Sequence, residues 1–503
     1  MPTILESLSQ FVSSPAAMVW MLLGTSLGII VGAIPGLTGA MLIALTLPLT
    51  FSMSGESALI LLVSMYVGSV SGGLISATLL RIPGTPASMM TTLDSYPLAE
   101  QGKARRALGL GIAASLVGGV VGWMCLVTLT GPLAVLSLQL GPFEFFALTL
   151  VALILIATVS GASLSKGLFA GLFGMLLAVP GINPASGAPR WTGGFSELED
   201  GFKLLPVLIG LFAIAQVISE SGNQTAQTDM RTAKASDSSR ILLGLGEYLS
   251  NGLNLIRSSL IGVFVGILPG VGANIGSVVA YSAAKGMSRT PEQFGAGSEE
   301  GILASEAANN ATVGGALIPL IAMGIPGSVI DSILIGALTI HGLQPGPLLM
   351  EQNPDTVNMM MATILLANVF MYVFMLVASP WLARLSSVPN AIRVPTIVTF
   401  CVIGSFALAN RMFDVWVMLG FGALGVLMNR LRIPVAPFVI GFVLAPIAEE
   451  HLLEGLMQSG GSWLPLFTRP VAFVMLLFSV AVAAFSLLGR LRIRPSTLRN
   501  PAD

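Results

Sequence analysis

Long apolar stretches separated by short polar connections dominate the chain. A helix needs about 20 apolar residues to cross a bilayer, and eleven stretches predict such crossings, near residues 57–93, 107–130, 143–162, 166–181, 201–220, 297–340, 357–380, 394–410, 412–429, 433–448 and 466–489. Two further stretches, 16–50 and 258–284, are interrupted by Pro-Gly. The pattern predicts an all-α polytopic membrane protein with about 11 full crossings and two interrupted segments.

The composition agrees with the pattern and excludes several classes of protein. Hydrophobic residues make up 54% of the chain and charged residues 9%, whereas soluble domains carry about 25% charge. No phosphate-binding loop, H-E-x-x-H motif or paired cysteine pattern is present in the sequence, which argues against those nucleotide, zinc and disulfide chemistries. The net charge of −1 has no basic excess that would suit nucleic acid, so no nucleic-acid partner is expected.

The basic residues indicate which connections face the cytoplasm. If Lys103, Arg105 and Arg106 lie inside and each crossing changes the side, 18 of the 23 Lys and Arg residues fall inside and four outside, with Arg81 in a span. Lys and Arg collect on the cytoplasmic side of membrane proteins. This register therefore predicts a cytoplasmic C-terminus and a cytoplasmic linker at the polar run 222–240.

The sequence contains an internal repeat. LGIIVGAIPGLTGA (27–40) corresponds to IGVFVGILPGVGAN (261–274) at an offset of 234, and Ile82-Pro83-Gly84 corresponds to Ile325-Pro326-Gly327 at an offset of 243. The charges flanking the copies are reversed, because basic residues occupy the late loop of the first copy and the early loop of the second. We therefore expect inverted repeats, which are a recurring plan of secondary transporters.

The interrupted segments predict hairpins and broken helices. As one helix, segment 16–50 would be about 52 Å long, well beyond a hydrocarbon core of about 30 Å. Pro35-Gly36 and Pro269-Gly270 break the two segments, so each is expected to form a re-entrant hairpin. Spans 57–93 and 297–340 are broken at 81–86 and 324–328. Such breaks are tolerated in a membrane where protein or a wet cavity satisfies the backbone.

The chain is accordingly divided into six parts by these features. They are the first inverted repeat (16–130), scaffold helices (131–221), a cytoplasmic linker (222–256), the second inverted repeat (257–356), C-terminal scaffold helices (357–489) and a basic cytoplasmic tail (490–503).

Polar residues and glycines at the four breaks are the candidate substrate ligands. Half-helix N-termini suit an anion, and freed carbonyls and hydroxyls suit sodium. The candidates for substrate binding are Gly36, Thr38, Gly39, Arg81, Thr85, Gly270, Gly272, Asn274, Asn309, Asn310, Gly327 and Ser328. The candidate sodium ligands are Thr38, Asn274, Asn310, Thr312 and Asp331. No catalytic residue and no cofactor are expected beyond a coupling sodium ion or proton.

Structural roles compete with these assignments. Glycines at 24, 28, 32 and 36 fall every four residues and are typical of close helix packing. Thr85, Ser88 and Ser328 are suited to helix capping, and Asn309 and Asn310 to hydrogen bonds between helices. Arg81 suits an internal ion pair or a snorkelling position as well as an anion, and Glu306 suits the inner surface as well as the site.

Four long motifs in order resemble a known family. GAIPGLTGAMLIALTLPLTF, IPGTPASMMTTLDSYPLAEQGKARRALG, GILPGVGANIGSVVAYSAAK and GIPGSVIDSILIGALTIHGLQPGP look like the large membrane subunit of the tripartite tricarboxylate transporters. The resemblance covers nearly the whole chain. It implies a permease of the bacterial inner membrane that works with a small four-helix membrane subunit and a periplasmic solute-binding protein. It also implies uptake of citrate or another carboxylate, driven by sodium or protons.

Two other functions are weighed against this one. A stand-alone ion or solute channel would share the composition and the broken helices. An intramembrane serine protease is suggested only by Gly161-Ala162-Ser163-Leu164 with His341 as the base, and four residues are a weak signal.

Overall fold

The computed structural model describes residues 4–34, 37–83, 85–159, 163–183, 186–221, 240–269, 272–385, 390–407 and 409–492. The described chain is almost wholly helical, and its strands are the short antiparallel pair β1 (Gly181–Ile182) and β2 (Pro189–Arg190). Six described helices have at least 18 residues and enough apolar character to span a membrane, and shorter apolar helices accompany them. The prediction of an all-α polytopic membrane protein is confirmed.

The elements before the linker form the first half of the molecule. They are α1 (Ile4–Ser13), α2 (Pro15–Ala33), α3 (Gly39–Thr46), η1 (Leu47–Ser52), α4 (Gly55–Leu80), η2 (Pro86–Ser88), α5 (Met89–Leu98), η3 (Ala99–Lys103), α6 (Ala104–Ser137), α7 (Pro142–Val159), α8 (Leu164–Leu177), η4 (Ser196–Leu198), α9 (Leu204–Leu208), η5 (Ile209–Ile214) and α10 (Ala215–Ser221).

The elements after the linker form the second half. They are α11 (Leu245–Ser250), α12 (Gly252–Ile267), α13 (Gly272–Met287), η6 (Pro291–Gln293), α14 (Glu299–Met323), α15 (Val329–Ile340), α16 (Pro347–Gln352), α17 (Pro354–Leu385), α18 (Asn390–Ala407), α19 (Met412–Arg430), α20 (Val435–Gln458), α21 (Leu464–Thr468) and α22 (Pro470–Arg492).

The chain is interrupted where the Pro-Gly pairs predict it. The first hairpin segment is the pair α2 and α3, and the second is the pair α12 and α13. Pro35, Gly36 and Gly270 lie outside the described residues. The two later spans also break as expected, because α4 ends at Arg81 with φ 58° and α14 ends at Gly324 with φ 73°. These left-handed caps stop each helix, and they correspond by the offset of the second repeat motif.

Glycines bring equivalent helices together in the two copies. A Cβ on Gly28 of α2 would stand 2.5 Å from the carbonyl oxygen of Met65 on α4, and one on Gly262 of α12 would meet the carbonyl of Ala308 on α14. The two glycines are related by the repeat offset of 234, and Met65 and Ala308 are related by the offset of 243. The same relation joins two further pairs, Gly72 with Ile29 and Gly315 with Val263. The glycine stripe therefore serves close packing, and the repeat is present in the structure as well as in the sequence.

Helices α4 and α14 run in opposite directions. The start of α4 lies beside the end of α15, because Thr50, just before α4, hydrogen-bonds to Nε2 of His341 at 3.1 Å. The start of α14 lies beside α5, because Oδ1 of Asp94 accepts a 2.8 Å bond from the Ser298 amide. Each copy thus begins where the other ends, so the repeats are inverted.

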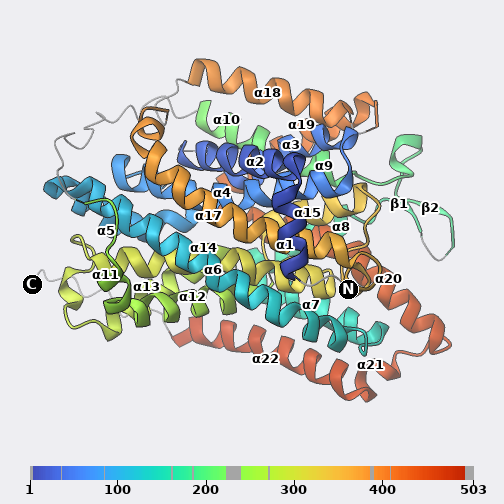
Figure 1. Ribbon diagram of the computed structural model, residues 1–503. Helices are drawn as coiled ribbons and strands as arrows, with labels where there is room; N and C mark the ends of the chain where they lie inside the picture. The colour runs from blue at the N-terminus through green and yellow to red at the C-terminus, as the bar shows by residue number, and fades with distance from the viewer. Residues whose placement is uncertain are drawn as a thin grey trace, which may run out of the picture.

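The two halves exchange partners across the molecule. Helix α6 of the first half packs on α14, and its counterpart α17 packs on α4. In the same way α8 packs on α20, while α19 packs on η5. Figure 1 shows α6 and α17 as long helices that cross the molecule between the same two ends, one marked by β1 and β2 and the other by α11. Each half therefore buries part of its helices against the other.

Ion pairs occupy both ends of this assembly. At the end assigned to the cytoplasm, Arg106 contacts Glu247 at 2.6 Å and Glu299 at 2.7 Å. At the opposite end, each of the four basic residues assigned outside is paired with an acid: Arg190 with Glu449, Lys203 with Asp200, Arg411 with Asp200 and Asp414, and Arg469 with Glu144. These ion pairs therefore lie at the two ends of the molecule.

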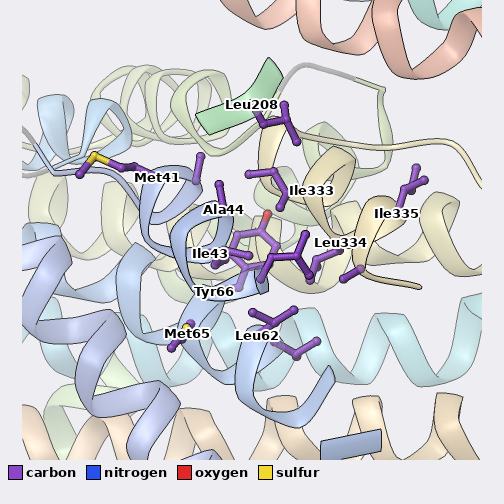
Figure 2. Packing of buried hydrophobic residues seen from close by; sticks show 14 of the residues in the cluster. Met41, Ile43, Ala44, Leu62, Met65, Tyr66, Leu208, Ile333, Leu334 and Ile335 are labelled. Atoms are coloured by element: carbon purple, nitrogen blue, oxygen red, sulfur yellow. The ribbon is translucent and has the colours of Figure 1, made fainter. Parts of the chain in front are cut away.

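The largest apolar cluster lies where both repeats meet the scaffold helices. It combines buried side chains of α3, α4, η5 and α15, including Ile43, Leu62, Ile209 and Leu334. Figure 2 shows Tyr66 of α4 among them, with its hydroxyl inside the apolar surroundings. A buried tyrosine hydroxyl needs a hydrogen-bond partner, and this one leads to the functional site.

Candidate functional site

The two hairpins converge on the start of α15. A Cβ on Gly39, the first residue of α3, would lie 3.3 Å from Cδ1 of Ile330. A Cβ on Gly272, the first residue of α13, would lie 4.0 Å from Cβ of Ser328. Residues 38–39, 272 and 328–331 therefore form one region, which we call the tip site. It brings together elements from both repeats.

Ser328 begins α15 and organises the tip site. Its side chain caps the helix by accepting a 3.3 Å bond from the amide of Asp331, as expected of a serine at this position. Its hydroxyl also lies 3.2 Å from the hydroxyl of Tyr66. Thr38 caps α3 in the same manner, accepting a 3.2 Å bond from the Met41 amide. Capping and proximity to a shared site thus occur together.

Asp331 is the charged residue of the tip site. Its side chain is fully buried, and neither carboxylate oxygen has a hydrogen-bond partner among the described residues. A buried carboxylate without partners is costly, and in a membrane such a group marks a functional position by default. The arrangement suits a cation or a proton that arrives with the substrate.

The equivalent break in the first repeat is built differently. The hydroxyls of Thr85 and Ser88 lie 2.8 Å apart, and Ser88 corresponds to Asp331 through the repeat offset. Arg81 is exposed, and its guanidinium lies 5.5 Å from the centre of the Tyr96 ring, a distance typical of a cation–π contact. Arg81 therefore faces Tyr96 and not the tip site, and among the described residues it forms no ion pair with the site.

A second buried polar group lies at the crossing of α4, α5, α6 and α14. Oε1 of Glu306 accepts a 2.5 Å bond from Thr91, and Oε2 accepts a 3.3 Å bond from Ser115. Asn310 donates to Ser115 at 2.9 Å, and its Oδ1 accepts a 2.6 Å bond from Ser71. We call these five residues, with Asn309, the glutamate cluster.

Asn309 belongs to the glutamate cluster but is only half satisfied. Its Nδ2 donates to the carbonyl of Val70 at 3.4 Å, while its Oδ1 is buried and has no donor among the described residues. Tyr66 and Val70 are one helical turn apart on α4, about 6 Å. The glutamate cluster and the tip site are therefore neighbours along the same helix.

Three other candidates have separate environments. The Thr312 hydroxyl bonds to the carbonyl of Ala308 at 2.7 Å, within α14 and against α12. Asn274 is exposed on the first turn of α13. Gly327 is buried, and a Cβ there would stand 2.7 Å from the Gly266 carbonyl oxygen, so close backbone approach accounts for this glycine. Among the described residues, no three His, Cys, Asp or Glu side chains converge as a metal site.

A cavity of about 1040 Å³ opens at the end assigned outside. Its wall includes Gly324 at the α14 cap and Ile335 of α15, one turn beyond Asp331. Both signs of charge line it, since Lys203 and Arg411 lie beside Asp200 and the wall also includes Glu450. The volume is at the upper end of the roughly 300–1,000 Å³ typical of ligand pockets. The cavity therefore ends within about one helical turn of Asp331 along α15.

The described residues give no geometric support to the protease hypothesis. Gly161 and Ala162 lie outside the described residues. His341 bonds to Thr50, and its partial burial holds the pKa of its imidazole below the ordinary value. This histidine links the end of α15 to the segment before α4.

Comparison with known proteins agrees with this architecture. Residues 18–440 match the family described as Tripartite tricarboxylate transporter TctA family. The chain belongs to this family. As a TctA-family chain it is a membrane component of tripartite tricarboxylate transporters, and the family is one of transporters rather than enzymes.

Two relatives of this TctA-family chain come from Agrobacterium vitis. The "Uncharacterized 52.8 kDa protein in TAR-I ttuC' 3'region" is 31% identical over 479 residues, which cover 95% of each chain. The "Uncharacterized protein in TAR-II ttuC' 3'region" is 32% identical over 231 residues, 46% of this chain and 96% of the relative. No solved structure matches the chain.

Sequence reasoning missed the residues that join the two groups. Tyr66, Ser71, Thr91 and Ser115 were not singled out, because a tyrosine, a threonine or a serine in an apolar span is unremarkable alone. The repeat contained one signal, since Tyr66 aligns with Asn309 at the offset of 243. A polar residue at the same place in both copies points to the interface between them.

Proposed function

We propose that this chain is the large permease subunit of a binding-protein-dependent secondary transporter that imports citrate or related di- and tricarboxylates. It works by symport with sodium or protons in the bacterial inner membrane, with its C-terminus in the cytoplasm. Its partners are a small four-helix membrane subunit and a periplasmic solute-binding protein that delivers the carboxylate.

One observation carries this proposal: the starts of α3 and α13, one from each repeat, lie at the start of α15, where Asp331 has a carboxylate without a hydrogen-bond partner among the described residues. Interrupted helices at a repeat interface are typical of ion-coupled transporters. The amide groups at the starts of α3, α13 and α15 suit a carboxylate. A cation at Asp331 offsets the charge of both the aspartate and the incoming anion.

The outer cavity supports import as the direction. It reaches from the outer end to Gly324 and Ile335 and carries Lys203 and Arg411. Alternating access then requires the tip site to open to the cytoplasmic end, by movement of the hairpins against the scaffold helices.

The test is uptake of labelled di- and tricarboxylates into proteoliposomes that contain all three proteins, with and without sodium and pH gradients. Accumulation against the substrate gradient is the expected result, and equilibration alone would identify a channel. In the same assay Asp331→Asn, which keeps the side-chain volume, is expected to abolish accumulation. Asp355→Asn, on α17 outside the tip site, is the matched control. Full accumulation by Asp331→Asn removes that residue from the site.

Asn274 provides a second test of the tip site. Because its side chain is exposed, Asn274→Ala should leave stability within about 0.5 kcal/mol of wild type. A loss of uptake would therefore reflect binding and not folding. Uptake at the wild-type rate would exclude Asn274 from substrate and sodium binding.

A further inference from the structure

The glutamate cluster contains an acid that has no basic partner among the residues that the structure describes. Glu306 is fully buried, two turns into α14. Its hydrogen-bond partners are the hydroxyls of Thr91 and Ser115. An ionised carboxylate in a membrane interior is costly. A proton or another cation is the direct way to remove that cost.

The charged and titratable groups on the elements packed against α14 are engaged elsewhere or lie toward the ends. Asp94 of α5 is held by Tyr281 and by the amides of the 295–298 loop. Arg106 of α6 pairs with Glu247 and Glu299. The remaining such groups on these elements are Glu56, Tyr66, Tyr96, Arg105, Cys125, Arg257, Lys285, Asp331 and Glu351. No hydrogen bond or ion pair within the described residues links any of them to Glu306.

The hydroxyls around Glu306 are oriented by their own partners. Ser115 accepts from the amide of Asn310, so its single proton is free for Oε2 of Glu306. Asn310 is fixed in turn by Ser71 of α4. The unpartnered Oδ1 of Asn309 is buried in the same cluster. The hydroxyl groups are thus preorganised around a carboxyl group whose charge can change, and the acceptor Oδ1 of Asn309 lies in the same cluster.

The cluster also connects the two repeats. It joins α4 and α5 of one repeat, α6, and α14 of the other, and along α4 it lies about one turn from the tip site. A change of charge at Glu306 therefore alters contacts between the repeats, which is what coupling requires.

We propose that Glu306 is a proton-binding site that couples transport to the proton gradient; this inference rests on the proposed function. Hydronium from the outer side protonates the carboxylate, giving the acid and water, and the acid returns its proton to water on the inner side. Asp331 remains the charged group at the substrate. Glu306 serves as the proton carrier in the helix crossing behind it.

Counterflow, the exchange of carboxylate between the two sides of the membrane, tests the proton site at Glu306 separately from the proposed transport function. Exchange between equal carboxylate pools needs binding and alternation but no net proton movement. Glu306→Gln mimics the protonated acid and is expected to keep exchange within twofold of wild type, while accumulation driven by a pH gradient falls at least tenfold. Glu300→Gln on the same helix is the control and should retain both. Accumulation by Glu306→Gln at the wild-type level would overturn the proposal.

Infrared difference spectroscopy of the purified full chain tests protonation without transport. In Asp331→Asn we expect a protonated carboxyl band that titrates with pH. If this band is absent from the double variant Asp331→Asn/Glu306→Gln, the assignment to Glu306 is supported. If the band remains in the double variant, the assignment is overturned. If Glu306→Gln does not fold, Ser115→Ala should shift the band, and an unshifted band counts against Glu306.

Transport can also contradict the proton assignment. If Glu306→Gln abolishes sodium-driven uptake and no titrating band is found, the proton assignment is overturned. Failure of exchange in wild type would refute the proposed function and leave the spectroscopic result to decide the proton site.

Discussion

The hydroxyl of Ser71 on α4 donates a 2.6 Å hydrogen bond to Oδ1 of Asn310 on α14, and this bond joins the two inverted repeats at their centre. Both side chains are buried. Asn310 passes the connection on to Ser115 of α6. A polar network in this position holds three helices in register, and it places Asn310 in the helix interface instead of the tip site.

A double-mutant cycle between Ser71 and Asn310 should measure this connection. Hydrogen bonds between membrane helices average about 0.6 kcal/mol and reach about 1.7 kcal/mol, so we expect a coupling free energy in that range. The measurement is the free energy of unfolding in mixed detergent, compared between Ser71→Ala, Asn310→Ala and the double variant. The pair Thr128 and Asn310, which do not bond to each other, is the control cycle. A coupling of zero would show that the bond contributes nothing.

Alanine at equivalent glycines should destabilise both repeats alike. A Cβ at Gly28 would stand 2.5 Å from a backbone oxygen, and one at Gly262 meets the equivalent oxygen on α14. Because backbone atoms cannot move aside easily, each substitution should cost about 1–3 kcal/mol of unfolding free energy. Gly420→Ala, with open space around it on α19, should be neutral or stabilising. Equal stability of all three variants would contradict the close packing.

The contact between Arg106 and Glu247 should make stability depend on acid pH. Hydrogen bonding to Arg106 holds the pKa of the Glu247 carboxyl below its ordinary value. The folded state therefore binds this proton less readily than the unfolded state, so the stabilisation is complete above about pH 4.3, the ordinary glutamate value. It is lost as the pH falls through the folded-state pKa.

The measurement is the thermal unfolding midpoint in detergent as a function of pH. Glu247→Gln should unfold at a lower temperature than wild type at pH 7, and the two curves should converge in acid. Glu292→Gln, an exposed glutamate of η6, should follow the wild-type curve throughout. A difference between Glu247→Gln and wild type that persists unchanged in acid would show that the charge of Glu247 is not its cause.

The sequence predicts the breaks well because their causes are local. Proline and glycine stop helices by themselves, and Gly324 adopts the left-handed conformation that ends α14. The partners of Glu306 could not be predicted in the same way. Thr91 and Ser115 reach it from helices about 200 residues away in sequence, and the rotation of each helix depends on packing that the apolar pattern does not specify.

The environment of Arg81 could not be predicted from the sequence either. A lone arginine in an apolar span suggests a counter-charge for an anionic substrate. In the structure it ends α4 with a positive φ, and its side chain is exposed and directed to Tyr96. The direction of the side chain depends on the cap conformation, which the sequence of span 57–93 does not reveal.

A bulky residue in the outer cavity should block uptake without unfolding the chain. Thr339 is exposed, lines the cavity and lies two turns beyond Asp331 on α15. Thr339→Trp places a large ring on the approach to the tip site, so we expect uptake from the outside to fall at least tenfold. The unfolding temperature should stay near the wild-type value, since an exposed substitution usually changes stability by about 0.5 kcal/mol or less.

Thr468→Trp is the matched control, because Thr468 is also exposed at the outer end but does not line the cavity. It should transport at the wild-type rate. The two variants are compared in uptake with the binding protein present and in exchange with the substrate loaded on both sides. Because exchange also passes through the cavity, Thr339→Trp should reduce it as strongly as uptake. Normal uptake by Thr339→Trp would mean that the carboxylate reaches the tip site by another route.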